Sequence, residues 1–307
     1  RKDFSDFNNK VVFDVEFDKA SIASNDLNFF YNEFGKNNIF YVDTHLVGTL
    51  NNFTTHNLKL TDKNQSEIIG TANFQNLFGK GNQEFYMKGS FDRITSDYEA
   101  LKIIMPRVLG KNLPSVLAKL GRVDLNGDVE LTQKYINANV YLLSKLGIVD
   151  GDLAIQNIDN IDNASYQGNI KLDNFDLGTL LSEKDLGKTT LDLDVDGKGF
   201  TQKLLNTSIE GTIKKFYYNG YNYQNVTVDG SMKMPYYKGY FNSNDPNLKM
   251  DFDGVIDLSN KASNYDFKAQ IDYADLYVLN FYRKDSLAIF KGNINFKAKG
   301  NSIDDLA

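Results

Sequence analysis

The sequence predicts a mostly β fold: an elongated, twisted, open trough of repeated antiparallel strands with a few short helices. Three observations predict it. Apolar and polar residues alternate with period two through most of the chain, as they do in strands with one apolar face. Glycine returns on the apolar side, which indicates that the strands bend there or that another group approaches closely. Only 4 of the 307 residues are proline, so little interrupts the strands.

The alternating segments are separated by turns rich in Asn, Asp, Gly and Lys, and we predict one strand for each. The first is 11–18, in which Val11, Phe13, Val15 and Phe17 share one face. The others are 38–50, 66–77, 83–93, 121–132, 135–142, 147–156, 163–174, 188–200, 205–219, 221–235, 246–259, 262–273 and 286–299.

The predicted helices are few and short. One helical segment begins at a capping box that runs from Ser96 to Glu99 and continues with apolar residues at helical spacing. Pro106 and Pro114 divide this segment into two pieces, and Gly121 ends the second piece.

Two further breaks resemble each other. Asp176 and Asp275 each follow a predicted strand, and each is placed to cap a single helical turn that folds apolar residues over an edge of the sheet. We interpret these breaks as divisions within one continuous, repetitive β domain over 1–307, part of a longer chain. The modules would be 1–94, 95–175, 176–274 and 275–307. Irregular loops that pack on a β-sandwich are the alternative.

Apolar positions of the same parity define the inner face of the predicted trough. The positions assigned to this groove are Leu125, Val129, Leu193, Val195, Val228, Met232, Met250, Phe252 and Ile256. The glycines on the same face, expected to widen the trough and curve the sheet, are Gly127, Gly197, Gly211, Gly230 and Gly254. The opposite face carries Asp, Asn and Lys and is expected to face water.

Composition excludes several classes of function. The net charge of -6 disfavours an extended surface for nucleic acid or for anionic lipid headgroups, which would need clustered Lys and Arg, so no nucleic-acid partner is expected. The absence of cysteine excludes disulfides, zinc-thiolate sites and cysteine nucleophiles. No apolar run approaches the roughly 20 residues that a membrane-spanning helix needs, and no signal-peptide core is present. Any anchor or export signal is therefore expected outside these residues.

Motifs that imitate chemistry are incomplete. Asp192, Asp194 and Asp196 match the first half of a calcium loop, but Lys203 occupies the position that requires a bidentate Glu. Apolar residues between these carboxylates instead indicate the wet face of a strand. His45 and His56, the only histidines, have no acidic partner clustered with them in the sequence. We therefore expect no enzyme activity, no metal and no cofactor.

The segment 169–181 reads Asn-Ile-Lys-Leu-Asp-Asn-Phe-Asp-Leu-Gly-Thr-Leu-Leu and resembles the TamB branch of the AsmA-like proteins. Further segments that are similar to this family are 186–199, 217–223, 226–230, 247–258, 274–280 and 300–306. The last resembles the opening of another family unit. The similarity is strongest over 95–307, and its motifs carry no catalytic signature.

The resemblance implies a periplasmic protein that is anchored in the inner membrane and reaches an Omp85-type (TamA-like) barrel of the outer membrane, both through segments outside this chain. It also implies that phospholipid acyl chains pass along the apolar trough in support of outer-membrane biogenesis. Burial of apolar surface at about 25 cal/mol/Å² would hold an acyl chain there without a specific headgroup contact. This chain would then be an interior piece that carries out no chemical step.

Three alternatives remain open. A structural β-sandwich or adhesin-like scaffold would bury the same apolar face against a second sheet. An assembly factor for outer-membrane proteins would carry no lipid. A transmembrane β-barrel must turn its apolar side to lipid, and internal glycines and capped helices between strands fit it poorly.

Asp285-Ser286-Leu287 resembles the Asp-Ser/Thr-hydrophobic acceptor of periplasmic O-glycosylation in one Gram-negative group. Ser286 is therefore a candidate glycosylation site, and its glycan would have to lie outside the trough. The alternative is a solvated turn serine that caps local backbone.

Overall fold

The computed structural model describes residues 6–30, 35–77, 84–104, 115–158, 160, 163–199, 204–233, 235–258 and 263–300. The chain divides into two compact units, Arg1–Ile161 and Asp162–Ala307, which are called unit 1 and unit 2 below. Strands β1 to β8 belong to unit 1 and β9 to β16 to unit 2. The predicted fold class is confirmed: the structure is mostly antiparallel β, with few and short helices.

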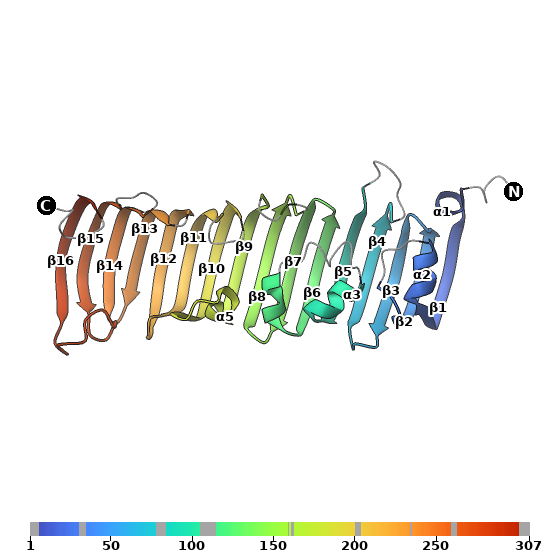
Figure 1. Cartoon of the computed structure of the whole chain (residues 1–307), viewed down its shortest axis with the longest axis horizontal. Coiled ribbons are helices and arrows are strands. Elements are labelled where there is room, and N and C mark those ends of the chain that lie inside the picture. The colour runs from blue at the N-terminus through green and yellow to red at the C-terminus, as the bar shows by residue number, and fades with distance from the viewer. Residues whose placement is uncertain are drawn as a thin grey trace. The chain divides into compact units, whose positions relative to one another are not determined.

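Unit 1 is a meander in which each strand pairs antiparallel with the next (Figure 1). Its elements are α1 (Phe7–Lys10), β1 (Val12–Ala23), α2 (Ser24–Phe30), β2 (Ile39–Thr49), β3 (Phe53–Asp62), β4 (Glu67–Gln75), β5 (Tyr86–Ser96), α3 (Tyr98–Ile104), the 3₁₀ helix η2 (Ser115–Leu120), β6 (Val123–Thr132), β7 (Tyr135–Ser144) and β8 (Gly147–Gln156).

Unit 2 repeats this arrangement, again with antiparallel pairing of sequence neighbours (Figure 1). Its elements are β9 (Ser165–Asp176), α5 (Leu177–Leu181), β10 (Leu186–Lys198), β11 (Asn206–Tyr218), β12 (Tyr221–Lys233), β13 (Tyr236–Asp245), β14 (Leu248–Asp257), β15 (Asn264–Asp275) and β16 (Ile289–Lys299).

The strand order of each unit is open. In the described residues of each unit, strands pair only with their neighbours in sequence, and the first strand does not pair with the last. Each unit is therefore a single open sheet, not two sheets packed face to face. The predicted divisions near 95, 176 and 275 stay a prediction. The boundary between the two compact units falls at another point of the sequence, between 161 and 162.

Two strands, β3 and β13, were absent from the sequence prediction. In β3 a bulge between Thr55 and Leu58, with Asn57 at φ 52°, reverses the parity of the apolar residues half-way along the strand. In β13 tyrosines occupy both faces, Tyr236 on one and Tyr237 on the other, so alternation is lost.

The predicted helical segment after β5 is confirmed in its described parts, with one correction at its start. The cap of α3 is Asp97, whose Oδ1 accepts from the backbone N–H of Ala100 at 2.8 Å. Ser96 instead ends β5, where its buried hydroxyl lies 3.0 Å from that of Ser66. The second predicted piece is η2, which ends at Gly121. Pro106 and Pro114 lie outside the described residues.

The two predicted Asp caps are confirmed. Asp176 accepts from the backbone N–H and the hydroxyl of Thr179, at 2.8 and 2.7 Å, and caps α5. Asp275 accepts from the N–H of Val278 at 3.0 Å. Their predicted covering role holds only in part. Leu279 is 1% exposed, whereas Leu181 is 51% exposed and covers nothing.

A small packed core lies at one corner of unit 1. Phe40, Val42 and Leu58 are buried there, and Leu27 of α2 packs against them. None of the helices in the described part of the chain is long and apolar enough to cross a membrane.

Candidate functional site

Cross-strand register in unit 2 aligns apolar residues into rows that cross all eight strands. We call the most buried of these rows the floor row. It consists of Ile170, Leu193, Gly211, Val228, Phe241, Phe252, Ala269 and Ile294. Every member is apolar or glycine, so the apolar face is continuous from β9 to β16 within this unit.

Three parallel rows flank the floor row on the same face. One is Gly168, Val195, Ile209, Gly230, Gly239, Gly254, Phe267 and Phe296. The next is Tyr166, Gly197, Thr207, Met232, Tyr237, Ile256, Tyr265 and Ala298. On the other side of the floor lie Leu172, Leu191, Ile213, Val226, Ser243, Met250, Ile271 and Gly292.

Burial differs between the rows. In the floor row, Leu193 is 8% exposed, Val228 6% and Phe252 5%. The flanking residues Val195 and Ile256, by contrast, are only partly buried. An apolar face pressed against a second sheet would be buried across all its rows. Partial burial occurs in every row, including Phe241 and Ile294 of the floor row, so the described residues do not cover this face completely.

Aromatic rings line one part of this face. Phe252 stacks on Phe241 with ring centres 5.0 Å apart, and its centre lies 5.2 Å from that of Phe267. The row continues to Phe296, 5.4 Å from Phe267. These rings form an unbroken apolar wall over β13 to β16, which aliphatic chains can contact without any polar partner.

Unit 1 carries equivalent rows. One is Phe13, Gly48, Phe53, Phe74, Met87, Leu131, Ile136 and Ile155, and the next is Val15, Leu46, Thr55, Ala72, Gly89, Val129, Ala138 and Leu153. A third is Ala20, Val42, Leu60, Ile68, Ile94, Leu125, Leu142 and Val149. Between the last two, Leu58, Gly70, Phe91, Gly127, Val140 and Gly151 align over β3 to β8.

The structure places all nine predicted groove residues, and all five predicted groove glycines, on these apolar faces. Leu125 and Val129 lie in unit 1, and the other seven apolar residues lie in unit 2. Sequence analysis missed their row partners, among them Ile170, Phe241 and Phe267. Their apolar parity was visible, but their alignment depends on strand register, which bulges such as the one after Phe17 shift.

At several glycines of the apolar face, the backbone of the neighbouring strand approaches closely. At Gly127, with φ 130°, a Cβ atom would lie 2.1 Å from the carbonyl oxygen of Asn139 on the neighbouring strand. At Gly211, with φ 144°, it would lie 2.3 Å from the carbonyl oxygen of Asp192. Neighbouring backbone, not open space, occupies the position of the missing side chain. These glycines therefore permit a backbone conformation and a close strand approach that other residues resist.

The outer face of unit 2 is polar. Asp192 and Asp194 both accept from the side-chain amide of Asn169, at 2.9 and 3.0 Å. Asp192 and Asp194 alternate with apolar residues on β10. The prediction that these carboxylates lie on the wet face of a strand, and not in a calcium loop, is therefore confirmed. Asp251 accepts from the Tyr240 hydroxyl at 2.6 Å and from Asn242 at 2.8 Å, and these hydrogen bonds lower the pKa of Asp251.

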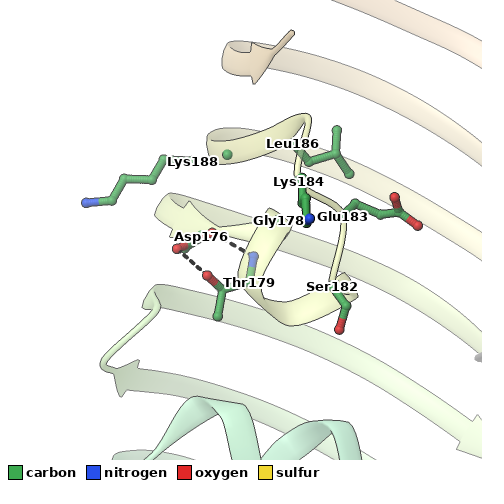
Figure 2. A pocket seen from close by; sticks show the side chains of 9 residues that line it. Asp176, Gly178, Thr179, Ser182, Glu183, Lys184, Leu186 and Lys188 are labelled. Atoms are coloured by element: carbon green, nitrogen blue, oxygen red, sulfur yellow. Dashed lines mark hydrogen bonds between the residues drawn. The ribbon is translucent and has the colours of Figure 1, made fainter. Parts of the chain in front are cut away.

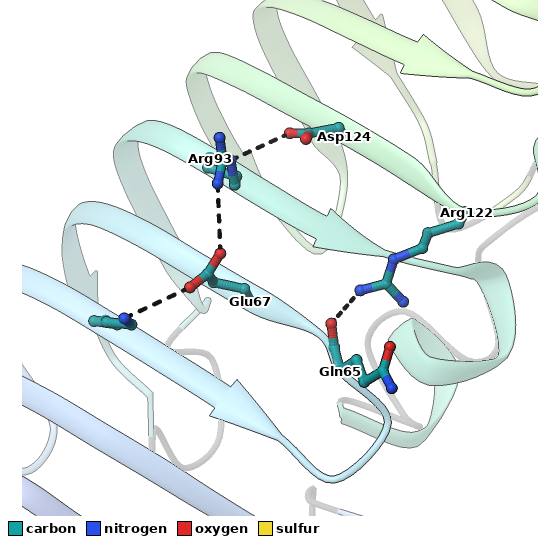
Figure 3. Close-up of polar contacts among 6 residues, drawn as sticks. Gln65, Glu67, Arg93, Arg122 and Asp124 are labelled. Atoms are coloured by element: carbon teal, nitrogen blue, oxygen red, sulfur yellow. Dashed lines mark hydrogen bonds and ion pairs between the residues drawn. The ribbon is translucent and has the colours of Figure 1, made fainter.

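The outer face of unit 1 carries ion pairs between charged residues of β3, β4, β5 and β6 (Figure 3). Glu67 lies 3.8 Å from both Lys59 and Arg93, and Arg93 lies 3.7 Å from Asp124. These groups are solvent-exposed, so each pair adds little stability. Their effect is to keep this face wet while the opposite face stays apolar.

The histidines correct one expectation. His45 does have an acidic partner, because its Nε2 lies 2.7 Å from Oδ1 of Asp14 on the neighbouring strand, and this hydrogen bond raises the pKa of His45. His56 lies opposite on β3, with ring centres 5.8 Å apart. Sequence spacing could not reveal this cluster, since Asp14 is 31 residues from His45. The described residues hold no group of three metal-ligating side chains.

A polar pocket of about 410 Å³ lies beside α5 (Figure 2). It is lined by the helix, by Glu183 and Lys184 in the connection that follows it, and by the start of β10, including Lys188. The Asp176 carboxylate is engaged in capping α5, and its hydrogen bonds from Thr179 lower its pKa. Glu183, Lys184 and Lys188 are exposed.

Ser286 is exposed in the turn before β16. Asp285, not Ser286, accepts the capping hydrogen bond from the N–H of Leu287, at 2.9 Å. An exposed hydroxyl is accessible to a transferase, and glycosylation there stays a prediction.

Comparisons of the chain with family models, with curated proteins and with solved structures found no match. The resemblance to the AsmA-like proteins therefore remains a prediction, carried by the segments quoted above.

Proposed function

We propose that the apolar face binds phospholipid acyl chains and that the chain is part of a periplasmic conduit that carries lipid between the inner and outer membranes. The single observation that carries this proposal is the floor row, an unbroken apolar line across the eight strands of unit 2, flanked by rows that stay partly exposed. Partly exposed apolar rows of this extent are costly in water and indicate an apolar occupant.

The chemistry of the face favours acyl chains over a polar ligand. Each methylene that leaves water for an apolar surface gains about 0.8 kcal/mol, so a long chain is held by area alone. In unit 2, the polar members of the rows are hydroxyl groups, such as those of Thr207 and Ser243. No fixed charge in these rows selects one headgroup, which suits a conduit through which lipids move.

The proposed role as a lipid conduit also requires attachment to both membranes. A conduit of this kind needs an anchor in one membrane and a partner in the other. We assign these roles to an inner-membrane segment and to an Omp85-type barrel, both outside this chain.

Site-specific photo-crosslinking tests the proposal. A photoreactive amino acid replaces Met232, Met250 or Ile256, which are partly buried and so tolerate a probe better than the floor residues do. The controls are Asp251, on the outer face of β14, and Asp192 and Asp194, on the outer face of β10. We expect phospholipid adducts from the first set only. Equal labelling of both faces would contradict the proposal, and adducts with outer-membrane proteins alone would favour the assembly-factor alternative.

A pair of adjacent substitutions separates lipid binding from folding. Val228→Asp places a carboxylate in the floor row, whereas Thr227→Asp places one on the outer face of the same strand. A buried unpaired carboxylate costs several kcal/mol, so we expect the Val228 variant to lose copurifying lipid and some stability. The Thr227 variant keeps both. If a folded Val228→Asp protein retains normal lipid content, the apolar face is not the binding site.

A further inference from the structure

An exposed apolar patch lies at one edge of unit 2, beside the rows of the apolar face, where the ring of Phe290 lies next to Gly292 of a flanking row. It is formed by the connection between β15 and β16 and by the first residues of β16. Its members are Tyr277, Val278, Phe281, Tyr282, Leu287, Ile289 and Phe290, and each is at least 38% exposed. Leu287 reaches 80% and Phe281 61%. Exposed apolar residues gathered in one connection are typical of an interaction site.

The connection that presents this patch is well ordered by its own hydrogen bonds. The N–H of Leu276 donates to the carbonyl of Ala288 at 2.8 Å, so the two ends of the loop meet. The N–H groups of Phe281 and Tyr282 both donate to the Leu276 carbonyl at 2.9 Å. The buried side chain of Leu279 anchors the loop to the body of the unit.

A side-chain bridge fixes the loop to a distant turn. The Asn280 amide donates to the carbonyl of Asn219 in the β11–β12 turn at 2.9 Å, and Arg283 donates to Asn280 at 2.7 Å. The exposed aromatic residues therefore stand on a fixed scaffold. Ordering such a loop costs conformational entropy, which the fold offsets with these contacts and Leu279 while it leaves the apolar side chains in water.

Charge indicates the occupant. Residues 277–291 hold three cations, Arg283, Lys284 and Lys291, and one carboxylate, Asp285, in a chain whose net charge is -6. Aromatic residues interspersed with Lys and Arg are typical of the interface of a lipid bilayer. Protein interfaces are depleted in lysine. The local positive charge is also complementary to anionic headgroups.

We propose that this patch inserts into the surface of an anionic lipid bilayer and holds unit 2 against it. Leu287 and Phe281 enter the headgroup–acyl boundary, and Arg283 and Lys284 contact the phosphates. The proposal does not depend on lipid binding in the groove, because the patch and the rows of the apolar face share no residue.

Vesicle flotation tests the proposal with the purified 307-residue chain. The vesicles contain phosphatidylcholine, with or without phosphatidylglycerol. We expect flotation with the anionic vesicles and a fall in affinity on the order of tenfold for each of Phe281→Ser and Leu287→Ser. Lys284→Glu should weaken binding by about tenfold, and added salt should weaken it further.

Two controls keep the outcome specific. Val12→Ser with Leu143→Ser removes comparably exposed apolar residues from unit 1, 70% and 44% exposed, and should leave flotation unchanged. Thr227→Asp, on the outer face of β12, should also leave it unchanged. Flotation that is kept with both Phe281→Ser and Leu287→Ser overturns the proposal, because another surface of the chain then binds the vesicle. Absence of wild-type flotation, or self-association in light scattering that these serine variants abolish, overturns it in favour of a protein partner.

Discussion

Two regions, one in each unit, have the same alternating strand pattern but differ in whether their apolar side chains are covered. At the corner of unit 1, Phe40, Val42 and Leu58 pack beneath Leu27 of α2 and form a closed core. In unit 2 the aromatic row continues from Phe252 to Phe267 and Phe296, which stay partly exposed.

The difference shows that a strand's alternation does not decide whether its apolar face becomes a core or a surface. A connection that folds back over the sheet decides it. At the unit 1 corner the chain inserts a helix with an apolar side chain directed at the sheet. In unit 2, α5 leaves Leu181 in water.

The largest expected effect tests this contrast directly. Phe40→Ala empties a closed site and should lower the free energy of unfolding by about 3–4 kcal/mol. Phe267→Ala removes a partly exposed ring from an open face and should cost about half as much, since less burial is lost. Urea denaturation of each variant, followed by probes in its own unit, measures both values.

Equal losses would mean that the aromatic row of unit 2 is a packed core. Addition of phospholipid supplies a second check. If acyl chains fill the face, lipid should reduce the loss in free energy of unfolding caused by Phe267→Ala. The loss caused by Phe40→Ala should stay the same.

Local sequence pattern was sufficient for most of the fold. Alternation located strands such as β6 and β10, and an Asp directly after a strand located the turns at Asp176 and Asp275. The misses have physical causes. A bulge at Asn57 hid β3, and tyrosines on both faces hid β13. The cap of α3 lay one residue beyond the predicted one because Ser96 is used by the strand.

The candidate site was less predictable than the fold. Parity assigned Val228 and Phe252 to one face, but only register brings them into one row with Leu193. Register is set by the pairing between strands, and a single sequence does not state which residues of two strands pair. The same limit applies to the outer face, where His45 on β2 lies beside Asp14 on the neighbouring strand β1.

A medium effect is expected at the glycines of the apolar face, some of which have positive φ and lie close to the neighbouring strand. Gly127 and Gly151 lie in the same row of unit 1. At Gly151 the nearest atom to an added Cβ is the Leu153 Cδ1 at 3.8 Å, an ordinary contact. We therefore expect Gly127→Ala to cost about 2 kcal/mol, from positive φ and backbone overlap, and Gly151→Ala to cost little or to stabilise slightly.

Thermal unfolding of the two glycine variants measures the difference, and a crystal structure of Gly127→Ala would show whether the strands flatten. Comparable stability of the two variants would show that the bend does not depend on glycine at 127.

The smallest expected effect contrasts the outer faces of the two units. In unit 2 the hydrogen bonds from Tyr240 and Asn242 lower the pKa of Asp251, so this cluster stays ionised at neutral pH. In unit 1 the hydrogen bond that His45 donates to Asp14 raises the pKa of His45 above its ordinary 6.5. A raised pKa in the folded state means that protonated His45 stabilises the fold. This contribution is complete below about pH 6.5 and is lost as the pH rises through the pKa of His45 in the folded state.

His45→Gln should therefore lower the melting temperature slightly at pH 5.5 and leave it unchanged at pH 8.5. Asp14→Asn should return the His45 titration, followed by NMR of the imidazole protons, toward its ordinary value. A His45 titration that Asp14→Asn does not move would mean that the pair does not persist in solution.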